Sequence, residues 1–151
     1  MFSDADIFWM QHAIHLAKTA AQQQEVPVGA VLVFDDTMVG EGFNCSISAC
    51  DPSAHAEVVA LRNSAKLMGN YRLMGSTLYV TLEPCIMCVG ALVQARVKHV
   101  IFGASDPKAG AVHSVFQMAQ DTQLNHRVEY QGGLLAEQCG NLLTEFFRSR
   151  R

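Results

Sequence analysis

Apolar positions repeat at helical spacing in four parts of the chain. The first stripe runs through positions 7, 10, 14, 17 and 21 and fades near Gln24, and Ser3 is a suitable N-cap for it. The same period returns from His55 to about Gly69, where a glycine is expected to end a helix. It returns again after Pro84, a residue suited to the first turn, and from about Leu135 to Arg148. These stripes predict four amphipathic helices.

Five segments between these stripes have the composition of β-strands. They are rich in β-branched and aromatic residues and are bounded by turn residues. The segments are 26–34 (VPVGAVLVF), 38–43 (MVGEGF), 76–82 (STLYVTL), 97–103 (VKHVIFG) and 127–131 (RVEYQ). The first two are separated by a short turn and predict a hairpin. A helix, a hairpin and then alternating strands and helices predict a three-layer α/β/α sandwich with a five-stranded mixed sheet.

Composition places this fold in one soluble domain. The chain has 151 residues, of which 50% are apolar and 17% charged, and no linker divides residues 1–151. No apolar run has the length of a membrane helix, and the acidic start predicts no signal peptide. The net charge of −3 argues against a generally basic nucleic-acid binder. Five cysteines, an odd number, favour a reducing cytoplasm over a disulfide framework.

The starts of the second and third predicted helices carry residues that bind metals. Cys85 and Cys88 are three positions apart, so they share a helix face in a first turn that favours thiolate. The pair alone is equally consistent with two small buried residues on a core helix. Pro84 before it, and a His-x-Glu sequence at His55, favour a metal site instead. We therefore predict zinc bound by His55, Cys85 and Cys88.

Three protein ligands are typical of a catalytic zinc, which keeps an open position for water and lowers the pKa of that water to about 7. A closed structural site needs a fourth ligand, for which Cys45 and Cys50 are the best competitors. Residues two apart on a helix point about 200° from each other, so His55 and Glu57 can converge only at the first turn. Glu57 is therefore predicted to carry protons rather than bind the metal. The alternative is a glutamate that stabilises the helix N-terminus.

The chain resembles a known family at these same residues. His55-Ala56-Glu57 followed by Pro84-Cys85-Ile86-Met87-Cys88 is similar to the H-x-E…P-C-x-x-C signature of the zinc-dependent cytidine deaminase superfamily. Further stretches, QEVPVGAVLV, GEGFN, DPSAHAE, NYRL, TLYVTLEPC and NHRVE, resemble the bacterial tRNA-specific adenosine deaminases from Ile7 to Arg151. The resemblance implies hydrolytic deamination of adenosine to inosine at the wobble position of a tRNA anticodon. It also implies one zinc ion per chain and a homodimer.

The resemblance further implies substrate-binding positions. Asn44 is expected to bind the flipped base in a pocket lined by Val28 and Leu82, with the backbone near Ala56 reading its polar edge. Asp106 and Lys108, in the 103–114 loop, match positions that the family uses near the nucleotide. This chain departs from the family pattern at Ser105, where arginine is common, and at His113, where a small residue is common.

The C-terminal sequence FFRSRR is a second candidate RNA contact. Phe147 is expected to stack on an unpaired base, and Arg148 and the arginines after it to hold phosphates, with Phe146 packed inside. The alternative is a core stripe of a helix that ends in solvated arginines.

Two other functions remain open from the sequence. A deaminase of free cytosine, guanine or a nucleoside would share the same zinc chemistry. A non-catalytic binding module stabilised by zinc would give Glu57 no role.

Overall fold

The computed structural model describes residues 1–150, so Arg151 of the predicted basic end lies outside the described residues. Its elements, in chain order, are α1 (Asp4–Gln22), β1 (Gly29–Phe34), β2 (Thr37–Phe43), α2 (Ala56–Met68), β3 (Thr77–Leu82), α3 (Ile86–Gln94), β4 (His99–Ala104), β5 (Glu129–Gly132) and α4 (Ala136–Arg148). Each overlaps the segment that the sequence predicts, although β1, β4 and β5 begin two or three residues later than expected. Helix α3 begins at Ile86 with Cys85 as its N-cap, so Pro84 precedes the first turn rather than lying in it.

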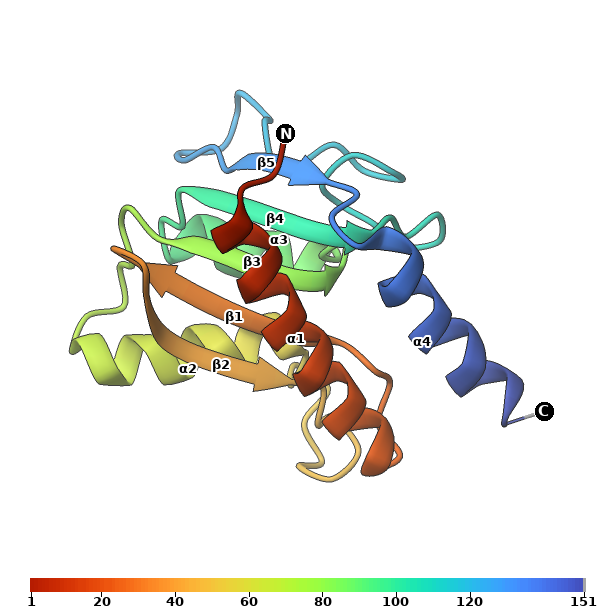
Figure 1. Cartoon of the computed structure of the whole chain (residues 1–151). Helices are drawn as coiled ribbons and strands as arrows, with labels where there is room; N and C mark the ends of the chain where they lie inside the picture. The colour runs from red at the N-terminus through yellow and green to blue at the C-terminus, as the bar shows by residue number, and fades with distance from the viewer. Residues whose placement is uncertain (151) are drawn as a thin grey trace.

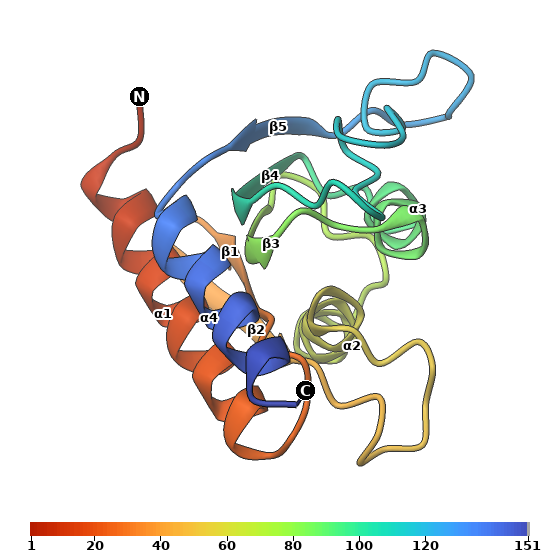
Figure 2. The same ribbon diagram turned by 90° about the vertical axis from the view of Figure 1, so that its right-hand side faces the viewer.

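The five strands form one mixed sheet in the order β2-β1-β3-β4-β5. β1 is antiparallel to β2 and β3, whereas β3, β4 and β5 are parallel. Helices α1 and α4 lie side by side on one face, and α2 and α3 cover the other (Figures 1 and 2). The predicted three-layer α/β/α sandwich is confirmed. Among the described residues, no helix has both the length and the apolar character needed to cross a membrane.

Alternating side chains of the strands divide the core between the two faces. Leu32, Leu78 and Phe102 pack with α2 and α3, whereas their neighbours Val31 and Tyr79 pack on the α1 side. Both sets are buried, as expected for central strands covered on both faces. Each fully buried aliphatic side chain contributes about 1.5–3 kcal/mol to folding. The sheet is therefore a closely packed support for the segments that follow the ends of its strands.

The N-termini of α2 and α3 meet beside the end of β3. A Cβ atom at Gly42 of β2 would lie 2.7 Å from the Ala56 carbonyl oxygen, so only glycine lets the start of α2 approach this closely. The residues that precede the helices, His55 and Cys85, are both N-caps with extended backbones. Neither side chain makes a capping hydrogen bond. Both are therefore free for another partner.

Candidate active site

His55, Cys85 and Cys88 form a group with the geometry of a zinc site. Their ligand atoms all lie within 4.8 Å of one another. The His55 Nδ1 atom lies 3.6 Å from Cys85 Sγ and 3.5 Å from Cys88 Sγ. Tetrahedral zinc, with bonds of about 2.3 Å to sulfur and 2.0–2.1 Å to nitrogen, requires a nitrogen–sulfur separation of about 3.6 Å. Both nitrogen–sulfur separations therefore match those around a tetrahedral zinc ion.

The two thiols have opposite ionisation tendencies. The pKa of Cys85 is lowered because the Cys88 thiol donates a hydrogen bond to it and because His55 lies beside it. The pKa of Cys88 is raised by the same pairing and by burial. Metal binding by both sulfurs requires both thiols to lose their protons. Neither Cys45 nor Cys50 belongs to the ligand group among the described residues, and Cys50 is exposed in its loop. This argues against a closed four-ligand site.

Glu57 lies in the first turn of α2, beside the metal ligands but outside their group. Its side chain is buried, and this burial raises its pKa to about 7. The carboxyl lines the same pocket as His55 and Cys85. A carboxyl group with a pKa near 7 can both accept and release a proton at neutral pH. Glu57 thus lies close to the candidate ligands without belonging to their group, and its predicted role as a proton carrier stays a prediction.

A pocket of about 230 Å³ opens onto this group. Its lining brings together several predicted residues from distant parts of the sequence: Val28, Asn44, His55, Glu57, Leu82, Cys85 and Asp106. The Asn44 Oδ1 atom accepts a hydrogen bond of 2.8 Å from the Ala56 backbone N–H. Because the oxygen is used, the Asn44 amide nitrogen remains for a ligand. Ala56 itself is fully buried and its N–H is taken, so its predicted contact with a base stays a prediction.

An adjoining groove of about 540 Å³ contains the remaining predicted contacts. Val26, Leu82 and Asp106 line both cavities, which makes the two continuous. Lys108 and Phe147 line only the outer groove. Phe147 is 51% exposed, whereas Phe146 is partly covered.

The basic end of α4 is only partly available for phosphate. The Arg150 guanidinium lies 3.8 Å from the centre of the Phe146 ring and donates a hydrogen bond to Gln24. Arg148 is exposed but does not line the groove. Its predicted phosphate contact is therefore not tested by the geometry.

Ser105 and His113, the two residues that differ from the family pattern, contact each other. Ser105 Oγ lies 3.2 Å from His113 Nε2. The His113 ring makes edge contacts with Phe102 and Tyr130. His113 thus packs between Ser105, Phe102 and Tyr130, with its Nε2 atom 3.8 Å from Glu83 Oε1, which the sequence alone could not reveal.

The sequence prediction missed three residues that line the pocket: Val26, Glu83 and Ala109. Val26 opens the predicted strand 26–34 but lies before β1, at the pocket rim. In the sequence, Glu83 is an acidic residue between Leu82 and Pro84, and nothing there indicates that it is buried. Its burial, at 2% exposed, is what marks it as unusual.

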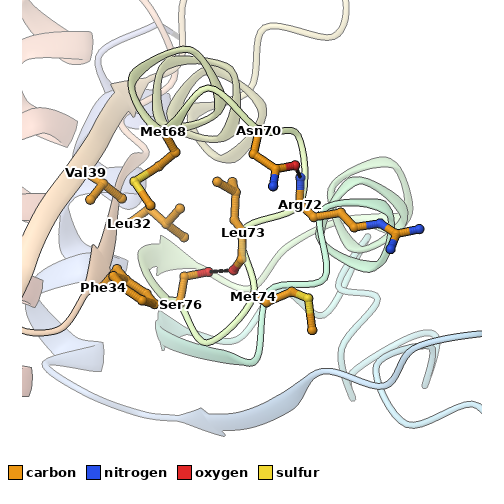
Figure 3. A pocket seen from close by; sticks show the side chains of 9 residues that line it. All are labelled: Leu32, Phe34, Val39, Met68, Asn70, Arg72, Leu73, Met74 and Ser76. Atoms are coloured by element: carbon orange, nitrogen blue, oxygen red, sulfur yellow. Dashed lines mark hydrogen bonds between the residues drawn. The ribbon is translucent and has the colours of Figure 1, made fainter.

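Another cavity, of about 360 Å³, lies at the opposite end of β1 (Figure 3). It is lined by Leu32, Phe34, Val39, Met68, Asn70, Arg72, Leu73, Met74 and Ser76. Its polar groups serve local structure: Asn70 Oδ1 accepts from the Arg72 N–H, and the Ser76 hydroxyl donates to the Leu73 carbonyl (Figure 3). Neither His55, Cys85 nor Cys88 lines it.

Comparisons with known proteins agree with this site. Residues 3–104 match the model of the cytidine and deoxycytidylate deaminase zinc-binding region. The tRNA-specific adenosine deaminase of Haemophilus influenzae is 52% identical over 150 residues, which cover 99% of this chain and 87% of the relative. The enzyme of the same name from Bacillus subtilis is 43% identical, covering 97% of this chain and 91% of the relative.

Two solved structures, one at 37% and one at 19% sequence identity, resemble this chain. A structure from a study of A-to-I editing by tRNA:A34 deaminases at the wobble position matches with a TM-score of 0.88 and 37% identity. The match covers 90% of this chain and 99% of that one. A guanine deaminase from Nitrosomonas europaea matches with a TM-score of 0.78 but only 19% identity, over 97% and 85% of the two chains. This second match shows a shared fold and nothing about substrate.

Proposed function

Since this chain belongs to the cytidine and deoxycytidylate deaminase family of zinc-binding domains, we propose that it hydrolyses adenosine to inosine at the wobble position of a tRNA anticodon. The observation that carries the proposal is the His55, Cys85 and Cys88 group with Glu57 beside it, in a pocket continuous with an outer groove. Relatives of 52% and 43% identity that are named for this activity support the choice of substrate.

His55, Cys85 and Cys88 would hold the zinc ion, whose role is to activate water for attack on C6 of adenine. Glu57 takes a proton from that water and delivers it to the departing amino group. Water and adenosine thus give inosine and ammonia. The buried carboxyl, with its pKa near 7, is suited to both halves of this transfer.

The pocket holds the base and the groove holds its neighbours. The Asn44 amide nitrogen donates to the base, and Val28 and Leu82 provide apolar walls. A pocket of about 230 Å³ accommodates one base, so the anticodon must present its adenosine unstacked. Lys108 and Phe147 then contact the flanking nucleotides by charge and by stacking.

The test of this function is inosine formation. Purified protein is incubated with a tRNA that carries adenosine at the wobble position, and the RNA is digested and analysed for inosine by mass spectrometry. Free adenine, cytosine, guanine and their nucleosides are assayed in parallel. Turnover of a free base or nucleoside without inosine in tRNA would instead identify the small-molecule deaminase considered above.

A Glu57→Ala variant distinguishes catalysis from zinc-stabilised binding. We expect no measurable inosine, with zinc content and melting temperature close to wild type, because Glu57 lies outside the ligand group. Glu41→Ala is the control, since the Glu41 carboxylate lies 3.3 Å from His12 and does not line the pocket. Full activity of Glu57→Ala would favour the non-catalytic module.

A homodimer accompanies this function. An apolar groove of about 240 Å³ runs between α2 and α3, lined by Val58, Leu61, Arg62, Ala65, Tyr71, Leu73, Ala91, Gln94 and Ala95. Tyr71, one of the lining residues, is 65% exposed and is therefore accessible to a second copy of the chain. Light scattering should give a mass of twice the 16.5 kDa chain. The reducing cytoplasm remains a prediction from the cysteines, all five of which are free.

A further inference from the structure

Glu83 is a buried carboxylate placed between the metal ligands and the groove. It follows Leu82, the last residue of β3, and precedes Pro84 and Cys85 in the chain. Its side chain has no exposed surface. A buried carboxylate is costly unless hydrogen bonds replace its hydration. The partners that Glu83 uses therefore indicate what its burial achieves.

All hydrogen bonds to the Glu83 carboxylate come from the segment 105–114, which we call the 105–114 loop. Oε2 accepts from the backbone N–H groups of Val112, His113 and Ser114 at 3.1, 2.9 and 3.0 Å. Oε1 accepts from the backbone N–H of Asp106 at 3.1 Å and from the Ser114 hydroxyl. Three consecutive amides on one oxygen form an anion-binding nest. The carboxylate thus holds both ends of the loop at once.

The loop is fitted closely to this anchor. A Cβ atom at Gly110 would lie 2.5 Å from the Glu83 carboxyl group and 2.6 Å from the Asp106 carbonyl oxygen. The Ala111 N–H also donates to the Pro84 carbonyl at 2.9 Å. The position of the loop is therefore set by the same few residues that lead into Cys85.

The loop in turn forms walls of both cavities. Asp106 and Ala109 line the inner pocket, and Ser105, Asp106, Pro107 and Lys108 line the groove. We propose that Glu83 is a positioning residue that fixes the RNA-contacting loop relative to the metal centre and so determines how tightly the anticodon binds. This inference rests on the proposed function for its substrate, but the anchoring of the loop can be measured without any substrate.

The test uses the zinc-loaded protein and an anticodon stem-loop that carries the wobble adenosine. Glu83→Gln keeps the side-chain shape but replaces one acceptor oxygen by an NH₂ group, which must face backbone donors. Kinetics give KM and kcat, and fluorescence anisotropy in a Glu57→Ala background gives the Kd for RNA. Hydrogen exchange followed by mass spectrometry reports protection of the 112–114 amides, and zinc is measured by elemental analysis.

We expect Glu83→Gln to exchange the 112–114 amides at least about tenfold faster and to raise KM and Kd for the stem-loop by at least about tenfold. The value of kcat at saturation should stay within about threefold, with one zinc per chain. Gly110→Ala, which displaces the loop while leaving the carboxylate intact, should raise KM and Kd in the same direction. It provides the test if Glu83→Gln fails to fold.

Two controls separate positioning from general weakening. Val33→Ala removes buried surface from β1 at the end remote from the pocket. It should lower the melting temperature about as much as Glu83→Gln does and leave KM unchanged. Ser114→Ala removes the hydroxyl bond but leaves the four backbone bonds, so it should change KM by less than about threefold.

Unchanged KM and Kd despite faster exchange would overturn the proposal, as would an equal rise of KM in Val33→Ala. Loss of zinc from Glu83→Gln would also overturn it, since Glu83 would then support the start of α3 instead. A wild-type protein that makes no inosine would refute the proposed function, and unaltered amide exchange in Glu83→Gln would separately refute the anchor.

Discussion

Asn44 is expected to serve both the fold and the substrate, and two substitutions can separate these roles. Its Oδ1 atom accepts from the Ala56 N–H at 2.8 Å, at the start of α2. The N-cap residue His55 makes no capping bond itself. Asn44 therefore replaces the missing cap from a distant loop, while its NH₂ group is left for the base.

The magnitudes follow from burial. Asn44→Ala leaves the N–H of the fully buried Ala56 without its partner, at a cost of about 1–2 kcal/mol if pocket water partly replaces it. For a chain of this size, that lowers Tm by roughly 2–8 °C. Asn44→Asp keeps an acceptor at a helix N-terminus, where a negative charge stabilises by about 0.3–1 kcal/mol. Its stability should stay within about 1 kcal/mol of wild type.

Both variants lose the amide donor to the base. One hydrogen bond is worth about 0.5–1.5 kcal/mol, so kcat/KM should fall about two- to tenfold in each. Calorimetry measures Tm, and inosine formation measures kcat/KM. Asn70→Ala is the matched control, because Asn70 Oδ1 also accepts a backbone N–H, from Arg72 at 3.0 Å, but on the exposed surface. It should change stability by less than about 0.5 kcal/mol. A wild-type Tm for Asn44→Ala, or wild-type activity for Asn44→Asp, would refute this reasoning.

Three further predictions concern stability, RNA binding and the metal. Burial of Asp6 opposes its ionisation, but hydrogen bonds, one of 2.7 Å from the Tyr79 hydroxyl, hold its pKa below the ordinary value. This stabilisation is complete above the pKa of Asp6 in the unfolded chain and is lost as pH falls through its pKa in the folded protein. In urea unfolding, the free energy of unfolding of Tyr79→Phe should therefore be about 1 kcal/mol below that of wild type at pH 7, and the difference should vanish in acid. Phe147→Ala should weaken stem-loop binding about fivefold in anisotropy, since stacking contributes about 1 kcal/mol at an exposed site. Phe8 is similarly exposed, and Phe8→Ala should not weaken binding. Equal Kd values for Phe147→Ala and wild type would show that Phe147 does not contact the RNA. Chelation should abolish inosine formation and added zinc restore it, while Cys50→Ser should retain one zinc per chain; zinc loss in that variant would indicate a fourth protein ligand.

The fold was predictable because its strongest signals are local. The apolar stripe of α1 and the Gly69 stop of α2, which adopts a left-handed backbone, lie where the pattern indicates. The start of α3 was less predictable. A helix that begins at Pro84 and a helix that begins at Ile86 with Cys85 as its N-cap are both compatible with the local sequence. The short strand β5 was located correctly, although its residues are mostly exposed and its pairing depends on β4.

The candidate site divides along the same line. That His55, Glu57, Cys85 and Cys88 lie together was predictable, because metal-site chemistry depends on residue type and on position at the start of a helix. The outer groove was not, because it exists only where α4 meets the 105–114 loop and the end of β3. The contact between Ser105 and His113 was equally hidden, since each residue alone has the properties of a surface loop.

His55 and Cys85 are the N-caps of two helices that pack on the sheet, so we expect the zinc site to depend less than the groove does on the surrounding loops. We expect binding of the anticodon to depend on loops that are held by single side chains such as Asn44 and Glu83. Substitutions at such side chains should therefore alter affinity and selectivity before they alter the zinc site. Because Glu83 lies two residues before Cys85, it is where the two parts are joined.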